Sequence, residues 1–393
     1  MSNERSKSIS RAEWKRQLRK LPWLLLIPLG IFVPRLAAQH PDWIEAYYSE
    51  KIYPFISAWM GKLNSFTRAS LAECILFALV ITVAVLTLVY LYRLLFRRIR
   101  FSAFVGYLLS LCIAGGVLLN LFYVMWGFNY FRPSLYTLLT LPVEERSTDE
   151  LEAACLRLAE EANALRGKVR ENEEGVFTLE EGYEAYFDQI PAAYAALGCE
   201  LPLFSRRTYA AKGVASSVGL SYAGISGIFI PHTGEANVNV DQPALLMLSA
   251  AAHETAHYLG IAREDEANFA SYLACTHSQD PSISYSGTML ALIHCGNKLY
   301  AADEEKYSAL YATYNEGVVR DLRSYNAYWD SFEGPVEEAA TTLNDNYLKF
   351  NQQEDGVKSY GMMVDLILAY FAAGNGSAIP LWFSQPVPAL LTQ

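Results

Sequence analysis

Residues 244–268 read ALLMLSAAAHETAHYLGIAREDEAN, and this stretch decides how the second half of the chain is expected to fold. An apolar run from Ala244 leads into an HExxH pattern made by His253, Glu254 and His257. Because residues four apart share one face of a helix, both imidazoles can point at one metal ion. Glu254 lies about a quarter turn away, where its carboxylate can reach a water molecule instead. The stretch therefore predicts a buried helix that carries a metal site.

The chain is expected to reverse direction directly after this helix. Gly260 follows His257 by three residues, and glycine tolerates the left-handed backbone that ends a helix. A second helix is predicted from Glu264 to about Cys275. Catalytic zinc commonly takes three protein ligands and leaves one position for water, so this second helix is expected to supply the missing ligand.

The two helices together resemble those of the thermolysin-like (gluzincin) zinc metallopeptidases, in which the HExxH helix is followed by a helix bearing Glu-x-x-Ala-Asp. The resemblance implies that Zn²⁺ is held by His253, His257 and Glu264, and that Glu254 acts as the general base in peptide-bond hydrolysis. It also implies that Asn268 orients one of the zinc-binding histidines. This chain departs from the family in having Asn268 where aspartate is usual, and in a connection of only six residues between His257 and Glu264. The competing third ligand is Glu266.

A wider region, about residues 200–365, resembles an uncharacterised family of bacterial membrane proteins that carry this HExxH motif. The shared features are 234–239 (GEANVN), 285–287 (YSG) and 358–361 (KSYG). The resemblance implies a membrane-anchored zinc peptidase that acts on a peptide or protein substrate of unknown identity.

The elements around the motif indicate an α+β domain that is mainly helical with a small sheet. Ser147 with Glu150 predicts a capped helix over 147–165, and Thr178 with Glu181 predicts a capping box that opens a helix towards Ala195. Residues 227–230 and 236–240 are expected to form short strands around the turn 231–234.

Further site residues follow less directly. The strand that contains Ala236, Asn237 and Asn239 is a candidate edge strand that pairs with an extended substrate, and an ordinary sheet edge is the alternative. A group that stabilises the transition-state oxyanion is also expected. The first choice for it is Tyr285, and the other candidates are Tyr360, His232 and His294.

The first third of the chain is predicted to anchor it in a lipid bilayer. Three uncharged or nearly uncharged runs, about 21–38, 72–94 and 101–126, approach or exceed the twenty apolar residues that cross a membrane as a helix. Residues 1–20 then form a basic arm, 21–127 a three-helix anchor and 128–393 one large domain. The first run also has features of a cleaved signal peptide, with small residues at Leu36-Ala37-Ala38.

The distribution of charge predicts the orientation. Residues 1–20 carry seven basic and two acidic side chains, and a second basic cluster, Arg93 to Arg100, follows the second run. The positive-inside rule then places the N-terminus in the cytoplasm and residues 128–393 outside a bacterial cell membrane. These outer residues hold 16 basic and 35 acidic side chains.

Composition excludes several classes of protein. A chain that is 52% hydrophobic and 18% charged is neither disordered nor fibrous. A net charge of −10 argues against binding to nucleic acid. Four of the six cysteines lie in the outer domain and allow two disulfides there, with connectivity open: Cys155, Cys199, Cys275 and Cys295.

Two other functions remain open from the sequence. One is a catalytically inactive ectodomain that zinc stabilises and that senses or binds a partner. The other is a metal-free structural module in which the two histidines pack in a core. Proteolysis within the membrane is rejected, because the motif lies more than 120 residues after the last span.

Overall fold

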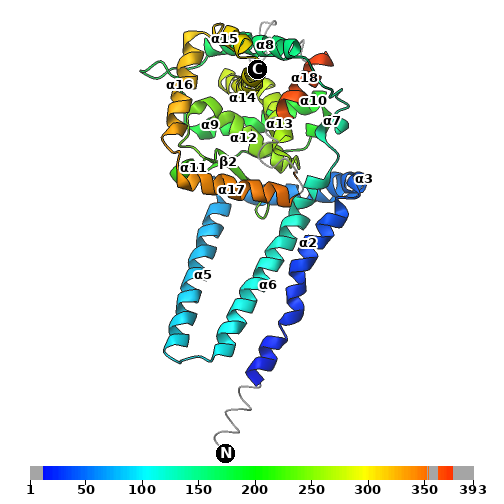
Figure 1. Cartoon of the computed structure of the whole chain (residues 1–393), viewed down its shortest axis with the longest axis vertical. Helices are drawn as coiled ribbons and strands as arrows, with labels where there is room; N and C mark the ends of the chain where they lie inside the picture. Colours follow the sequence, from blue (N-terminus) through cyan, green and yellow to red (C-terminus); the bar gives the residue numbers. More distant parts are fainter. Residues whose placement is uncertain (1–11, 352, 354–361, 375–393) are drawn as a thin grey trace, which may run out of the picture. The chain divides into compact units, whose positions relative to one another are not determined.

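The computed structural model describes residues 12–351, 353 and 362–374 (Figure 1). The chain divides into two compact units. The first unit comprises Met1–Arg132 together with Ile230–Glu235, and the second comprises Pro133–Phe229 and Ala236–Gln393. The sequence predicted a boundary near residue 127, but it gave no sign that a loop from the second half would cluster with the first unit.

Three helices of the first unit are long and apolar enough to cross a membrane: Ala12–Ala37, Leu71–Leu95 and Phe101–Met125. This confirms the three predicted runs as helices. The first helix is irregular, because a 3-10 stretch, η1 (Leu21–Leu25), precedes α2 (Leu26–Ala37). The second and third are α5 (Leu71–Leu95) and α6 (Phe101–Met125). Asn120 ties α6 to α2, because its amide donates to the Leu26 carbonyl at 2.7 Å.

The segment between the first two spans is helical, which the sequence did not predict. It consists of α3 (Pro41–Trp43), a π-helix, η2 (Ile44–Ile52), and α4 (Tyr53–Asn64). A short 3-10 helix, η3 (Gly127–Phe131), follows α6. The loop Ile230–Glu235 packs within this unit, since Asn64 donates to the Thr233 carbonyl and the Glu235 carboxylate accepts from the backbone of Leu71 and Ala72.

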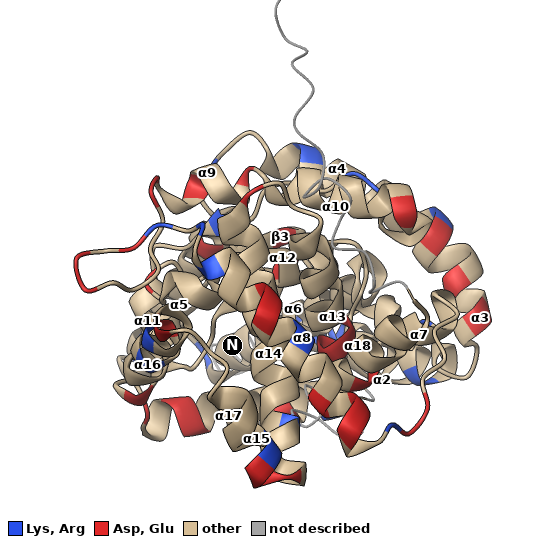
Figure 2. Cartoon of the chain, turned by 90° about the horizontal axis from the view of Figure 1, so that it is seen from above, with Lys and Arg blue, Asp and Glu red and all other residues tan. Residues whose placement is uncertain are grey.

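The second unit is mainly helical, in agreement with the predicted class. Its helices are α7 (Leu135–Leu138), α8 (Thr148–Arg166), α9 (Tyr183–Phe187), α10 (Ile190–Glu200), η4 (Pro202–Phe204), α11 (Ser217–Tyr222), α12 (Ala244–Tyr258), α13 (Glu264–Thr276), α14 (Pro281–Ala302), α15 (Glu304–Tyr311), α16 (Glu316–Asp330), α17 (Pro335–Phe350) and α18 (Met363–Ala372). Acidic side chains outnumber basic ones over residues 128–393, and red segments are scattered over the helices in Figure 2.

One three-stranded sheet is present in the described part of the chain, in the order β1-β3-β2. Its strands are β1 (Lys212–Gly213), β2 (Gly227–Ile230) and β3 (Glu235–Val238). β1 runs parallel to β3, with Lys212 opposite Asn237. Since β3 is the central strand, the prediction that Ala236, Asn237 and Asn239 form a sheet edge was wrong, and β2 is an edge instead.

The helix predictions around the motif hold with one exception. Ser147 and Glu150 form a complete capping box at the start of α8. Thr178 caps no helix, because α9 begins only at Tyr183. The predicted single helix is also divided in two, since α9 ends at Phe187 and α10 begins at Ile190. Pro191 at the start of α10 lacks a backbone N–H, which suits the first turn of a helix.

The helix with the HExxH motif, α12, lies amid the other helices of the second unit (Figure 1). Nearly all its residues from Leu245 to Tyr258 are buried. Small side chains from Ser249 to Ala252 let neighbouring elements approach closely. The Tyr194 hydroxyl donates to the Ala252 carbonyl at 2.8 Å, directly before the first histidine of the motif. The helix is therefore fixed in place where the site residues begin.

Candidate metal centre

The turn between α12 and α13 brings the three expected ligands together. Gly260 has φ of 86°, a left-handed conformation that glycine adopts without strain, and its N–H donates to the His257 carbonyl at 2.9 Å. Helix α13 then starts at Glu264. The six residues between His257 and Glu264 therefore suffice to place the first residue of α13 against α12.

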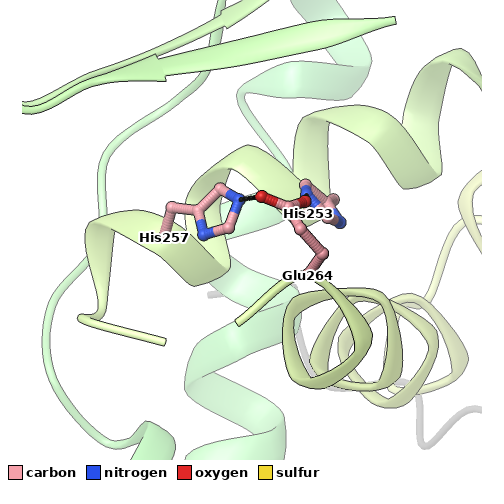
Figure 3. Close-up of side chains that lie close together, drawn as sticks. All are labelled: His253, His257 and Glu264. Atoms are coloured by element: carbon pink, nitrogen blue, oxygen red, sulfur yellow. Dashed lines mark hydrogen bonds and ion pairs between the residues drawn. The ribbon is translucent and has the colours of Figure 1, made fainter. Parts of the chain in front are cut away.

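His253, His257 and Glu264 converge on one point (Figure 3), and one ligand atom from each lies within 4.8 Å of the others. The Nε2 atom of His253 is 3.1 Å from Glu264 Oε2, and that of His257 is 3.6 Å from Glu264 Oε1. The ligand atoms of a tetrahedral zinc site, each about 2.0–2.1 Å from the metal, are about 3.3 Å apart. The two distances between the imidazoles and Glu264 are close to this value.

The other nitrogen of each imidazole has a hydrogen-bond acceptor. The Nδ1–H of His257 donates to the Ile261 carbonyl at 2.7 Å, and that of His253 donates to Asn268 Oδ1 at 2.8 Å. With their protons on Nδ1, the two neutral imidazoles turn Nε2 lone pairs towards Glu264. Partners of this kind fix the tautomer and orientation of metal-binding histidines. Asn268 thus lies where the family resemblance implied.

Three electron-pair donors that face one another in a buried site need a positive charge between them. Without a metal, that charge must come from protons. Burial opposes protonation of His257, but the nearby Glu264 carboxylate outweighs this and raises the pKa of His257 to about 9. Burial likewise raises the pKa of Glu264, yet the two histidines outweigh it and hold that pKa well below its usual value. The residues present therefore fit a bound cation.

Glu254 lies beside this cluster and differs from it in its partners. The side chain is 4% exposed, and its Oε2 atom is buried without a hydrogen-bond partner among the described residues. Burial is the main cause that raises the pKa of Glu254 to about 6, and the Phe229 backbone N–H, which donates to the carboxylate, opposes it. One carboxylate oxygen is thus held by β2 while the other has an open acceptor position.

Gly227 on β2 is a site residue that the sequence analysis missed. A Cβ atom at this position would lie 2.6 Å from Glu254 Oε1 and 2.8 Å from its Cγ. Only a residue without a side chain lets β2 pass this close to Glu254. The signal was the glycine itself, because a glycine within a strand often marks a close approach of other groups.

The three residues predicted to form the substrate-binding edge are buried in or directly after β3. Asn237 is 1% exposed on the central strand, and Ala236 is buried with it. Asn239 is fully buried, and its amide donates to Ser221 Oγ at 2.9 Å and to the Ile225 carbonyl at 3.1 Å. None of the three lies on a free edge of the sheet.

Glu266, the alternative third ligand, does not belong to the group that His253, His257 and Glu264 form. Its Oε1 atom accepts from the Leu135 backbone N–H at 2.7 Å and pairs with Arg263 at 2.9 Å. The carboxylate therefore faces the start of α7, while Glu264, two residues earlier, faces the histidines.

The four residues predicted as candidates for an oxyanion stabiliser differ in their surroundings. Tyr285 is fully buried, and its hydroxyl donates to Asp321 Oδ2 at 2.8 Å, so the predicted catalytic role was wrong and the residue is structural. His232 belongs to the first unit and contacts the Leu118 carbonyl at 3.1 Å. Tyr360 lies outside the described residues. His294 on α14 interacts with His253: burial first, and then the charge of His253, lowers the pKa of His294 to about 4.

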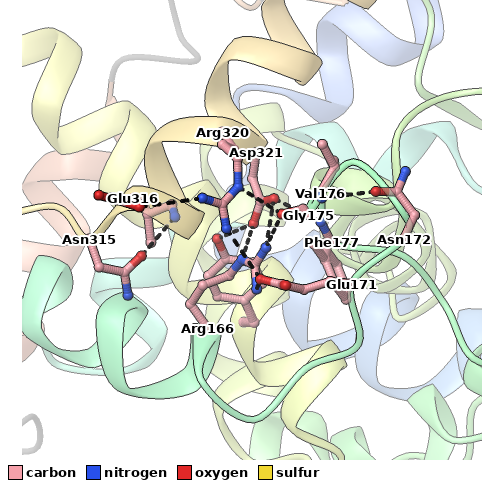
Figure 4. A network of polar contacts seen from close by, with 12 residues as sticks. Arg166, Glu171, Asn172, Gly175, Val176, Phe177, Asn315, Glu316, Arg320 and Asp321 are labelled. Atoms are coloured by element: carbon pink, nitrogen blue, oxygen red, sulfur yellow. Dashed lines mark hydrogen bonds and ion pairs between the residues drawn. The ribbon is translucent and has the colours of Figure 1, made fainter.

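Through Asp321, Tyr285 joins a network of polar contacts between α8 and α16. Figure 4 shows Arg166 and Asp321 within this network. At its centre, Arg166 Nε lies 2.5 Å from Asp321 Oδ2, and Asp321 Oδ1 accepts from the Phe177 backbone N–H at 2.7 Å. Gly175, with φ of 73°, offers its carbonyl to Arg166 at 2.8 Å. Every group here has a partner within the network, which indicates a role in holding the fold.

The cysteines are all free thiols, so neither of the two possible disulfides is formed. Cys155, Cys275 and Cys295 are buried, and Cys199 is exposed.

Comparison with protein families gives one match. The family described as "Protein of unknown function (DUF3810)" matches residues 48–368, which is most of the chain. The chain belongs to the DUF3810 family. No curated protein and no solved structure matches it. The match covers two of the three candidate spans, the metal centre and the Arg166–Asp321 network. All of these features therefore lie within the DUF3810 region.

Proposed function

We propose that this DUF3810 protein is a membrane-anchored zinc metallopeptidase. The observation that carries the proposal is the convergence of His253, His257 and Glu264 beside a carboxylate, Glu254, that is not part of the cluster. The three converging residues would hold Zn²⁺. A separate acid next to such a site is what metal-assisted hydrolysis requires, since one group must accept a proton from the attacking water.

Zinc, when bound there, would supply Lewis acidity and lower the pKa of a coordinated water. The remaining work falls to the side chains. Glu254 would take a proton through its unpartnered Oε2 and later deliver it to the leaving amine. Its raised pKa of about 6 is closer to neutral pH than that of an ordinary glutamate, which suits both steps.

Two further elements would serve the same reaction. β2 replaces β3 as the edge strand that pairs with an extended peptide, because β2 is the outer strand and lies against Glu254. His294 replaces Tyr285 as the group that stabilises the oxyanion. His294 lies close enough to His253 for the two imidazoles to interact electrostatically, and a neutral imidazole offers one ring N–H as a donor.

A zinc-stabilised binding ectodomain is the second candidate. It is favoured by the burial of Glu254 and His257, which are 4% and 5% exposed. In that case zinc would hold α12 to α13, and Glu254 would have no chemical role.

The substitution Glu254→Gln separates the two candidates. The full-length protein in detergent is incubated with a library of quenched fluorescent peptides, and cleavage is compared with the wild type. We expect Glu254→Gln to bind zinc and to lose roughly 10²- to 10⁴-fold in kcat. Zinc-bound protein without any cleavage above background in the wild type would favour the binding ectodomain.

A further inference from the structure

The second unit has a concentrated apolar surface. The described part of this unit has twelve large hydrophobic side chains that are exposed, and seven of them lie on α17 or on the segment 217–228. Each of these seven is 40–71% exposed. Apolar residues that gather in this way mark a surface that contacts another phase or molecule. We call this surface the apolar patch.

Helix α17 contributes a continuous stripe to the apolar patch. Its members are Val336, Leu343, Tyr347 and Phe350, with spacings of seven, four and three residues. At about 100° per residue, these positions fall within a narrow sector of the helix surface. Leu348, which is fully buried, lies on a different side and packs into the unit. The stripe is therefore a second apolar face, separate from the one that docks the helix.

The segment 217–228 extends the stripe. It contributes Val218, Tyr222 and Ile228. The Tyr222 and Phe332 rings are 4.9 Å apart, and a Cβ atom at Gly224 would lie 3.1 Å from the Glu337 side chain. These contacts place the segment beside the start of α17, and α11, β2 and α17 lie along one edge of the unit in Figure 1.

The chain connects the apolar patch to the end of a span. Ile228 is two residues before Ile230, where the loop that belongs to the first unit begins. Within that unit, Glu235 caps the start of α5, accepting from Leu71 at 3.0 Å and from Ala72 at 2.6 Å. A span begins at the membrane surface, so this loop is held at that surface. Only Phe229 separates Ile228 from this loop, so the length of the chain keeps Ile228 close to the membrane surface.

Within the first unit, this loop lies against a helix that has features of a membrane surface. Gly234 in the loop lies against Met60 of α4. Helix α4 exposes Trp59 and Phe55, which are 62% and 77% exposed. Tryptophan and other aromatic side chains are typical of the boundary between lipid and water.

From this short connection along the chain we propose that the apolar patch inserts into the surface of the bilayer that the first unit spans. The inference does not depend on the proposed catalysis. Helix α17 carries three acidic residues and one basic residue, so its net charge is −2. Interfacial helices that bind anionic lipid are rich in lysine and arginine on their polar face. Insertion of the apolar patch is therefore hydrophobic and needs no anionic lipid.

The test uses the full-length protein reconstituted in phosphatidylcholine liposomes, with a fluorescent label on α17. Leu343→Cys carries the label on the stripe, and Thr342→Cys is the matched control, one residue away on the polar exposed side. The three exposed cysteines are first replaced by alanine: Cys74, Cys112 and Cys199. Quenching is then measured with a nitroxide near the lipid headgroup and with aqueous iodide.

We expect the label at 343 to be quenched by the lipid nitroxide at least about threefold more than the label at 342, and less by iodide. Addition of anionic lipid should leave this ratio unchanged. Equal quenching of both labels by iodide would overturn the proposal, because the apolar patch would then face water. A label at 343 that is shielded from iodide but not quenched by the lipid nitroxide would also overturn it. In that case another part of this chain, or a second copy, would cover the stripe.

Discussion

Asn268 Oδ1 lies 2.8 Å from His253 Nδ1, so the hydrogen-bond acceptor of this imidazole is a neutral amide and not a carboxylate. The neutral amide fixes the tautomer of the imidazole. As a hydrogen-bond acceptor for the ring N–H, however, it is weaker than an aspartate carboxylate would be. The His253 imidazole is therefore less basic than it would be beside an aspartate.

This relationship predicts that Asn268→Asp strengthens zinc binding and that Asn268→Leu weakens it, each by about 10- to 100-fold. Competition with a chelator of known affinity measures both. Asn344→Asp on the surface of α17 serves as the control for the added charge. Equal zinc affinities in all three variants would show that Asn268 does not affect zinc binding through His253.

The contact between Gly227 and Glu254 predicts a selective loss of activity. In Gly227→Ala, the new methyl group would lie 2.6 Å from Glu254 Oε1, so the carboxylate or β2 must move. We expect kcat to fall by about 10²-fold, because small displacements of a reacting group have large effects, while zinc content stays at the wild-type level. Gly219→Ala is the matched control, since no atom lies within 4 Å of a Cβ there. A normal kcat in Gly227→Ala would contradict the proposed role of β2 in the site.

His294 provides the third prediction. Its loss in His294→Ala should lower kcat by about 10²-fold and leave zinc binding unchanged, as expected for a donor that acts on the developing negative charge. The control is His277→Ala, a histidine of the same unit that is near Glu200 at 3.3 Å. An effect of the same size in His277→Ala would point to general destabilisation.

Tyr285 should behave as a structural residue. Tyr285→Phe removes the hydrogen bond to the buried Asp321, so the free energy of unfolding should fall by about 1.5 kcal/mol. Activity per folded molecule should not change. Thermal unfolding and peptide cleavage together check this, with the exposed Tyr300→Phe as control. A large drop in kcat at unchanged stability would restore Tyr285 to the catalytic candidates.

Features that depend on residues close in sequence were predictable. The HExxH spacing, the turn at Gly260 and the capping box of Ser147 each act within one or two helical turns. Glu264 followed from a motif, and the structure brings it to the two histidines. The spans followed from length and hydropathy alone.

Features that depend on tertiary contacts were not predictable. The order of the strands, which makes β3 central, is set by pairing between distant segments. The approach of Gly227 to Glu254 joins residues on separate elements, and so does the bond from Tyr285 to Asp321. Thr178 matched a capping pattern, yet the helix begins five residues later at Tyr183, so tertiary packing outweighed the local signal.

The metal content of the purified full-length protein tests the central claim most directly. Elemental analysis would compare the wild type with His253→Ala and with the control His277→Ala. His277 is a histidine of the same unit whose Nδ1–H donates to the Leu273 carbonyl, and it lies outside the group of His253, His257 and Glu264. The account predicts about one zinc per chain in the wild type and in His277→Ala, and loss of zinc in His253→Ala. A folded wild-type protein that holds no zinc, even after zinc is added back, would contradict it.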